Sequence, residues 1–224
     1  MKNIENRVLG IMGAGGLARE VYELALIVNR KSRRWNKFVF IDKNNTNEVI
    51  NGCCVLSYDS AKSEYGNSLE VVMGIGEPAI REKLYHDVIS DGIPTPTLIH
   101  PDVYIPKSTS IGTGVTIQYG CFVSCNVIIG NYVFLQPQCN IGHDDVIEEG
   151  CMIAGFSNLG GIVHIGRYSY LGLSSVIKQA VSIGNYSIVG MGSVVYKDIP
   201  DEVIAIGNPA RIIANNTEKK VFGH

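Results

Sequence analysis

Aliphatic residues recur at every sixth position along the second half of this chain. From Ile105 to Val195, each sixth residue is isoleucine, leucine or valine. A second series, two residues earlier in each repeat, is small or β-branched at every position except Asp145. A period of six fits neither the 3.6-residue repeat of a helix nor the alternation of an ordinary strand. It is typical of a parallel β-helix, in which each hexapeptide supplies one short strand and one corner.

Three hexapeptides make one triangular coil, so the aliphatic positions fall into three inward columns. One column is isoleucine throughout, at positions 111, 129, 147, 165 and 183. β-branched side chains suit stacked, buried strands, and the small residues of the second series suit cramped corners. The pattern therefore predicts an all-β unit over residues 98–196, with about five coils stacked roughly 4.8 Å apart.

Residues 1–97 carry a different pattern, in which short apolar runs alternate with helical periodicity. Residues 7–12 read as a buried strand, and apolar residues on one face over 17–28 predict a helix. Further strands are predicted at 38–41 and 69–75, and a second helix at about 79–90. This order predicts a small Rossmann-like βαβ domain ahead of the β-helix, with residues 197–224 as a C-terminal tail.

The first strand runs into a glycine-rich loop that suits a phosphate group. Gly13, Gly15 and Ala18 match G-x-G-x-x-A, and the second strand ends at Asp42. Glycine allows backbone N–H groups to approach an anion, and the helix N-terminus adds positive potential. A complete dinucleotide fold would indicate an oxidoreductase. However, these residues hold only one mononucleotide half and no second half follows, so we expect a nucleotide site.

Composition excludes several classes of function. Of the 224 residues, 46% are hydrophobic and 18% charged, and the net charge is −2, so we expect neither nucleic acid nor an anionic membrane as partner. No apolar run approaches a membrane span, and residues 8–16 do not read as a signal peptide. The six cysteines lack zinc spacing, and Cys121, Cys139 and Cys151 occupy small slots of the repeat. A reducing, cytoplasmic location is therefore expected.

The candidate chemistry lies in one corner of the repeat. His143 follows Ile141 by two residues, so we expect an outward imidazole with Cys125 one coil behind and Gly161 one coil ahead. A glycine beside the ring leaves room for a substrate, and an imidazole can act as a general base. Either Asp144 or Asp145 could hold the ring from its other nitrogen, as the carboxylate of a triad does. The other histidine of the repeat, His164, is expected at the surface, and the two do not stack into a metal site.

Three segments, read together with the repeat, resemble one known family. They are Gly13–Glu20, Gly142–Ile147 and Gly207–Arg211. The combination resembles the sialic acid O-acetyltransferase-like group of the hexapeptide acyltransferases, which includes N-acetyltransferases of nucleotide-linked amino sugars. The resemblance runs from about Val8 to Ile213. It implies that the β-helix is left-handed and that the protein forms a homotrimer with one cleft per interface.

The resemblance also implies an activity. The protein would move acetyl from acetyl-CoA, a co-substrate rather than a bound cofactor, to the amino group of a nucleotide-linked deoxyamino sugar. His143 would be the general base, and Asp144 would raise its basicity; no metal is implied. Two alternatives remain open: O-acetylation of a sugar acid such as sialic acid, and a non-catalytic protein that binds a sugar nucleotide.

Binding residues carried over by position form two sets. The nucleotide sugar would lie against Gly13, Gly15, Gly16, Leu17, Asp42, Lys43 and Gly76. Acetyl-CoA would lie against Met152, Gly161, Gly172, Leu173, Gly190 and Met191. The chain departs from some relatives at Met152, where they carry histidine, so only an apolar or backbone contact could remain there. Gln136 and Gly142 likewise stand where some relatives carry Asn and Glu.

Overall fold

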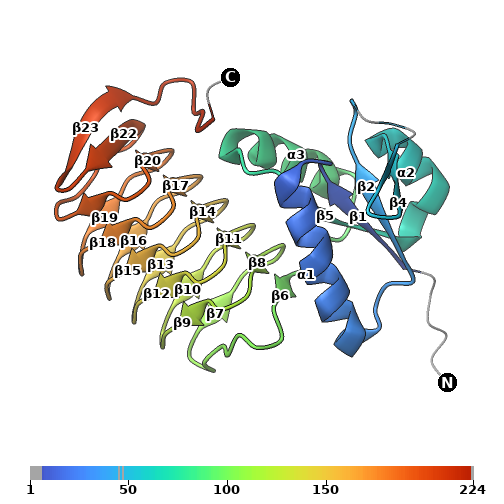
Figure 1. Ribbon diagram of the computed structural model, residues 1–224, viewed down its shortest axis with the longest axis horizontal. Coiled ribbons are helices and arrows are strands. Elements are labelled where there is room, and N and C mark those ends of the chain that lie inside the picture. Colours follow the sequence, from blue (N-terminus) through green and yellow to red (C-terminus); the bar gives the residue numbers. More distant parts are fainter. Residues whose placement is uncertain (1–6, 45, 47, 223–224) are drawn as a thin grey trace. The chain divides into compact units, whose positions relative to one another are not determined.

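The computed structural model describes residues 7–44, 46 and 48–222, and its chain forms two compact units (Figure 1). The first unit runs up to Gly76 and resumes over Lys83–Thr97. The second contains Glu77–Glu82 and the chain from Leu98 onward. No helix among the described residues has both the length and the apolar character needed to cross a membrane.

The first unit is built on a five-stranded sheet in the order β3-β4-β2-β1-β5. Its strands are β1 (Val8–Met12), β2 (Lys37–Ile41), β3 (Val49–Ile50), β4 (Cys53–Leu56) and β5 (Leu69–Met73). β1 pairs in parallel with β2 and β5, and β2 with β4, whereas β3 is antiparallel to β4. Every residue of β1 and β5 is buried, in keeping with the continuous apolar run of β1. The one charged residue of β5, Glu70, accepts hydrogen bonds from Arg34 and Trp35.

The helices of this unit are α1 (Gly16–Ser32), α2 (Tyr58–Tyr65), the 3₁₀ turn Gly66–Ser68 and α3 (Pro78–Ser90), which begins in the second unit. α1 buries Ala18, Val21, Leu24 and Ala25 on one face, as the periodicity predicts. It runs four residues beyond the predicted end and stops at Arg33, whose φ is 48°. The elements β3, β4 and α2 were not predicted, because they are short and their apolar residues follow no sustained period.

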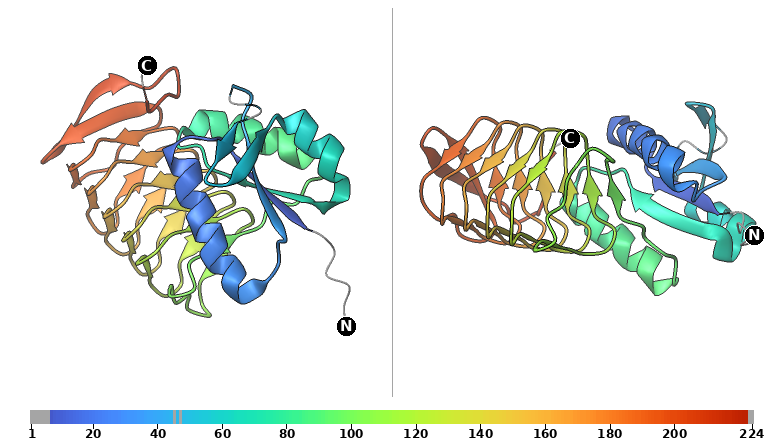
Figure 2. Two further views of the ribbon diagram at one scale, coloured as in Figure 1. Left: turned by 45° about the vertical axis from the view of Figure 1, so that its right-hand side comes forward. Right: turned by 90° about the horizontal axis from the view of Figure 1, so that it is seen from below.

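The second unit is the predicted parallel β-helix, with three faces of short strands (Figures 1 and 2). Face 1 contains β7 (Ser110–Ile111), β10 (Ile128–Ile129), β13 (Val146–Ile147), β16 (His164–Ile165) and β19 (Ser182–Ile183). Face 2 contains β6 (Leu98–Ile99), β8 (Thr116–Ile117), β11 (Phe134–Leu135), β14 (Met152–Ile153), β17 (Tyr170–Leu171) and β20 (Ile188–Val189). Face 3 contains β9 (Phe122–Val123), β12 (Asn140–Ile141), β15 (Asn158–Leu159), β18 (Val176–Ile177) and β21 (Val194–Val195).

Each strand of a face pairs with the strand eighteen residues further along, as Ile129 does with Ile147. The aliphatic series fills the interior, and the Ile129, Ile147, Ile165 and Ile183 side chains of the isoleucine column are buried. The predicted fold class, a small α/β domain followed by a parallel β-helix, is therefore confirmed.

Face 2 differs from the others because most of its outward side chains, among them Phe134 and Met152, are also buried. Within the second unit, the Arg81 guanidinium lies 5.9 Å from the Phe134 ring, and Phe222 packs edge-on against Tyr170. The Glu77 carboxylate accepts hydrogen bonds from the backbone N–H groups of residues 221 and 222. Residues 77–82 and the end of the described chain therefore cover part of this face.

The stretch predicted as a C-terminal tail contains an antiparallel hairpin. β22 (Val203–Gly207) pairs in parallel with β20, and β23 (Ala210–Asn215) pairs antiparallel to β22. The hairpin thus extends face 2 after the hexapeptide pattern has ended.

Asp145, the exception in the small series, is fully buried and binds two backbone groups. Its Oδ2 accepts the Gly142 N–H at 2.7 Å, and its Oδ1 accepts the Val163 N–H at 2.8 Å, one coil ahead. Thr109 and Ser169 also accept N–H groups eighteen residues further on, from Val127 and Ser187. Asp145 therefore ties one coil to the next, a role that a small apolar residue cannot perform.

Asp145→Asn should destabilise the protein by about 2–3 kcal/mol, because the amide NH₂ would face one of the two buried N–H donors. Burial raises the pKa of Asp145 from 3.8 to about 6. Because the folded protein holds the Asp145 proton more tightly than the unfolded chain, Asp145 stabilises the wild type fully below about pH 4 and loses this effect as the pH rises through about 6. The difference in free energy of unfolding between wild type and Asp145→Asn should therefore narrow from about pH 4 to pH 7. Urea unfolding at several pH values measures both effects. Asp144→Asn, on the exposed neighbour, is the control, and equal losses for the two variants would contradict this account.

Candidate active site

His143 lies in the corner between β12 and β13, where face 3 meets face 1. The backbone there is held by the adjacent coils: the Asp144 N–H donates to the Cys125 carbonyl at 3.1 Å, and the Ile162 N–H donates to the His143 carbonyl at 2.8 Å. Gly142 has no room for a side chain, since a Cβ there would lie 2.2 Å from the Gly160 carbonyl oxygen. This tight corner directs the His143 side chain outward, where 49% of it is exposed.

The imidazole of His143 is paired with the neighbouring carboxylate. Its Nδ1 lies 2.7 Å from Oδ2 of Asp144. The backbone of Asp144 is in the left-handed region, with a φ of 61°. The hydrogen bond with His143, and a second one from Asn126, hold the pKa of Asp144 below its usual value. An ionised Asp144 can only accept, so Nδ1 carries the proton and Nε2 presents its lone pair. This is the arrangement that a general base requires.

Gly161 provides the space beside the imidazole. A Cβ at this position would lie 2.4 Å from Nε2 of His143 and 2.5 Å from its Cε1. The ring therefore lies directly against the backbone of the next coil, as the eighteen-residue stacking predicts, and it fills the space that the sequence led us to expect for a substrate. Any larger residue at 161 would displace the imidazole from this position.

The structure distinguishes between the two aspartates. Asp144 contacts the imidazole at the surface, whereas Asp145 points into the coil and is occupied by two backbone N–H groups. The geometry thus pairs His143 with Asp144, and Asp145 supports the corner from inside.

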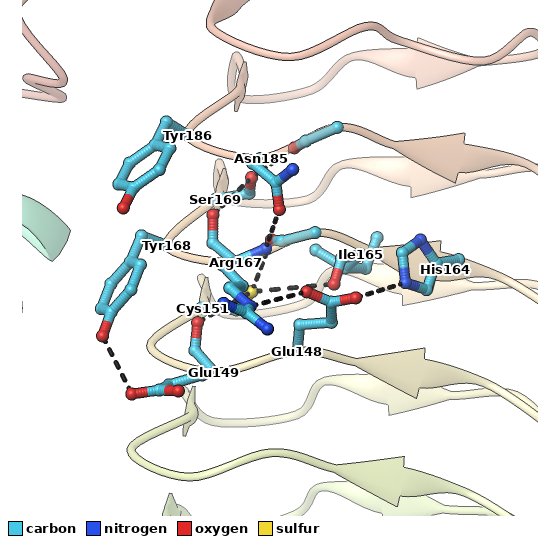
Figure 3. Close-up of polar contacts among 12 residues, drawn as sticks. Glu148, Glu149, Cys151, His164, Ile165, Arg167, Tyr168, Ser169, Asn185 and Tyr186 are labelled. Atoms are coloured by element: carbon cyan, nitrogen blue, oxygen red, sulfur yellow. Dashed lines mark hydrogen bonds and ion pairs between the residues drawn. The ribbon is translucent and has the colours of Figure 1, made fainter.

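His164 takes part in a separate cluster on face 1 (Figure 3). Its Nε2 lies 2.9 Å from Glu148, and the same carboxylate lies 3.3 Å from Nε of Arg167. These residues line a hollow of about 670 Å³. Tyr186 also lines it, and its ring stacks on that of Tyr168 with the centroids 5.5 Å apart. His164 is half-exposed, in keeping with the predicted surface position, and its imidazole is held by the hydrogen bond with Glu148.

In the first unit, the residues predicted to bind the nucleotide sugar gather at one sheet edge. The loop 13–17 follows β1, Asp42 and Lys43 follow β2, and Gly76 lies beyond the end of β5. Because β1, β2 and β5 are parallel neighbours, their carboxyl ends meet at the same edge, where ligands bind in open α/β sheets.

The glycines of this loop have two different roles. Gly13 has a φ of 98°, and a Cβ there would lie within 3.2 Å of residues 74 and 75. Both the backbone conformation and the packing therefore require glycine at position 13. A Cβ on Gly15 or Gly16 would meet nothing within 4 Å. Gly15 caps α1 without any side-chain hydrogen bond. The first turn of α1 therefore offers backbone N–H groups beside open space, which suits an anion.

Asp42 is held by local hydrogen bonds, whereas Lys43 beside it is exposed. Its N–H donates to the Leu56 carbonyl at 2.9 Å, and its Oδ1 accepts the Asn44 N–H at 2.8 Å. Lys43 is exposed, and Leu17 is half-buried at the start of α1. The Asp42 side chain thus stabilises a local turn while lying at the predicted nucleotide-sugar site.

The residues predicted to bind acetyl-CoA do not form one group within a protomer. Gly172, Leu173, Gly190 and Met191 lie in successive coils at the corner between faces 2 and 3, where Met191 is 74% exposed. Gly161 belongs to the His143 corner. Met152 lies on face 2, where only 2% of it is exposed, so its side chain is packed inside the protomer rather than presented at either corner.

Packing also requires glycine in the corner between faces 2 and 3. A Cβ on Gly172 would lie 2.5 Å from the Met191 N–H, and one on Gly190 would meet Ile206 at 2.7 Å. Within the described part of the chain, no three His, Cys, Asp or Glu residues are grouped as a metal site would need.

Comparison with known proteins gives matches to both units. Residues 8–88 match the PglD N-terminal domain family. The GDP-perosamine N-acetyltransferase of Escherichia coli O157:H7 is 31% identical over 212 residues, covering 90% of this chain and 94% of that protein. The chain also matches an acyl-[acyl-carrier-protein]–UDP-N-acetylglucosamine O-acyltransferase of Stutzerimonas stutzeri at 35% identity, but covers only 42% of that relative's length.

Two solved structures are similar over nearly their whole length. PerB from Caulobacter crescentus, in complex with CoA and GDP-perosamine, is 28% identical with a TM-score of 0.83, covering 92% of this chain and 97% of that one. The acetyltransferase domain of PglB from Neisseria gonorrhoeae FA1090, in complex with acetyl coenzyme A, is 27% identical with a TM-score of 0.86 and coverages of 93% and 100%.

Gly161→Ala should displace the His143 imidazole and leave the fold intact, with the free energy of unfolding within about 0.5 kcal/mol of wild type, because the new methyl meets only a movable ring. NMR shifts of the His143 ring protons report the displacement. Gly142→Ala is the matched control: its methyl would meet backbone, so we expect a loss of more than about 2 kcal/mol. Unchanged His143 shifts in Gly161→Ala would show that the ring does not rest on residue 161.

Proposed function

We propose that this chain, which belongs to the hexapeptide acyltransferase family together with GDP-perosamine N-acetyltransferase, transfers acetyl from acetyl-CoA to the amino group of a nucleotide-linked deoxyamino sugar. Such a reaction is a step of polysaccharide or glycan biosynthesis. The observation that carries the proposal is the His143–Asp144 pair, in which Asp144 orients an exposed imidazole and Gly161 accommodates its ring. A base in this position is what an incoming amine needs.

In the proposed reaction the amine nitrogen attacks the thioester carbonyl. As the N–C bond forms, His143 Nε2 takes the proton of the amine, while Asp144 stabilises the imidazolium. When the C–S bond breaks, the imidazolium returns the proton to the sulfur of the leaving CoA. His143 and Asp144 are therefore the proposed catalytic residues, and the rest of the site aligns the two substrates.

Residues 1–97 are proposed to bind the nucleotide sugar and residues 98–196 to carry out the transfer. The open first turn of α1, at Gly15 and Gly16, would receive the phosphates. Leu17, Asp42, Lys43 and Gly76 would contact the remainder of the ligand, and Gly13 would shape the loop.

Acetyl-CoA is proposed to bind between protomers of a homotrimer with C3 symmetry. Leu173 and Met191, with Gly172 and Gly190, would present the exposed corner of one protomer to the His143 corner of the next, where Gly161 lies. The three motifs of the chain further suggest the sialic acid O-acetyltransferase-like group. Six free cysteines suit a reducing compartment, and we propose the cytoplasm.

The direct test incubates the purified protein with acetyl-CoA and GDP-, UDP- and dTDP-linked amino sugars, and follows thiol release and the mass of the sugar product. A gain of one acetyl group on the amine of a nucleotide sugar is the expected result. Acetylation of free sialic acid alone would favour the O-acetyltransferase alternative. Binding of nucleotide sugars without thiol release would favour a non-catalytic protein.

His143→Ala should lower kcat by about 10²–10⁴-fold, because the general base is lost. The KM values should change little, since the variant keeps both binding surfaces. Steady-state kinetics on a variant with wild-type melting temperature checks this. Near wild-type turnover in that variant would remove His143 from the mechanism.

Gly16→Ala should raise the KM for the nucleotide sugar by about tenfold or more, because the added methyl enters the space proposed for the phosphates. Its stability should rise slightly, since alanine is the better helix former and the methyl meets no other atom. The KM for acetyl-CoA serves as the internal control. An unchanged KM for the nucleotide sugar would exclude this loop from the sugar site.

A further inference from the structure

We infer that Asn126 is a positioning residue for the general base and acts through Asp144; this inference rests on the proposed function. Asn126 lies one coil behind Asp144, eighteen residues earlier, in the same corner. Its Nδ2 donates to Asp144 Oδ1 at 3.0 Å, while Asp144 Oδ2 faces His143 Nδ1 at 2.7 Å. The two carboxylate oxygens thus have separate partners, and the corner forms a chain of three side chains from Asn126 to His143.

The corner backbone places these side chains in register. Asn126 and Asp144 have φ values of 60° and 61°, so both project from the same left-handed position of successive coils. Asparagine and aspartate tolerate this conformation better than most residues. The Asn126 N–H also donates to Ser108 Oγ at 3.1 Å, which fixes the corner from the coil behind.

The residue one coil ahead of Asp144 cannot provide the hydrogen bond that Asn126 provides from one coil behind. Ile162, one coil ahead with a φ of 62°, has an aliphatic side chain. Asp145 is turned inward and is occupied by the coil backbone. In the part of the chain that the structure describes, the side-chain hydrogen bonds of Asp144 are those with His143 and Asn126.

The consequence for the reaction is orientational. Asp144 is half-exposed, so without the amide its carboxylate can rotate toward water and release Nδ1 of His143. Nε2 would then spend less time aligned with the amine, and kcat would fall while both KM values stayed near wild type. A residue with a purely structural role would instead change stability.

The test compares three variants with wild type. Asn126→Gly removes the amide and keeps a residue that adopts positive φ freely, so it should fold normally with kcat reduced about tenfold and KM within about twofold. Asn126→Asp keeps the shape but sets a second carboxylate against Asp144. It should lower kcat further and move the acidic limb of the pH–kcat profile to higher pH, because added negative charge favours the imidazolium. Asn51→Gly, at another left-handed asparagine in the β3–β4 turn, is the matched control and should change nothing.

NMR provides a readout that does not depend on a substrate. In wild type the Nδ1–H proton of His143, hydrogen-bonded to Asp144, should be observable and shifted downfield, and Asn126→Gly should broaden or move it. An unchanged resonance, or kcat within twofold of wild type in Asn126→Gly, would overturn the inference. If wild type acetylates no amino sugar, the proposed function fails, and the resonance alone then decides whether Asn126 positions the pair.

Discussion

The pairing of each residue with the one eighteen positions further along governs the whole second unit. Parallel strands stacked at about 4.8 Å bring identical positions of successive coils into contact, so every side chain has one neighbour ahead and one behind. The position and contacts of a side chain therefore depend on the residues eighteen positions before and after it. The imidazole of His143 is accommodated because residue 161 is glycine, and the carboxylate of Asp144 is held because residue 126 carries an amide.

The same register imposes a strict conformation at the corners. From Gly114 to Gly192, every sixth residue has a positive φ, whatever its side chain. Glycine, asparagine and aspartate meet this requirement at low cost, but Tyr168 and Ile162 also adopt it. Stacking of the coils thus overrides local preference. Polar residues that suit the left-handed conformation, such as Asn126 and Asp144, can then project outward in a fixed direction.

Much of this unit could be predicted because its period is long and unbroken. The aliphatic columns, the corner position of His143 and the neighbour Gly161 all follow from counting in sixes and eighteens. β4 and α2 were missed because short elements of mixed composition carry no comparable period. The burial of Met152 was missed because the hexapeptide pattern marks inward residues only, and segments outside the repeat cover part of face 2. Asn126 could have been found by the same counting from Asp144, had the left-handed corner position been recognised.

Asp144 and Asp145 show how the coil assigns different chemistry to adjacent identical residues. Residue 145 belongs to the inward series, where a carboxylate must satisfy buried N–H groups and its pKa is raised by burial. Residue 144 occupies the left-handed corner, where its pKa is lowered by the hydrogen bonds from His143 and Asn126. An inward carboxylate could not orient an outward imidazole without breaking the link between coils. The division between the two is therefore a consequence of the six-residue period, and it leaves the exposed carboxylate to serve the base.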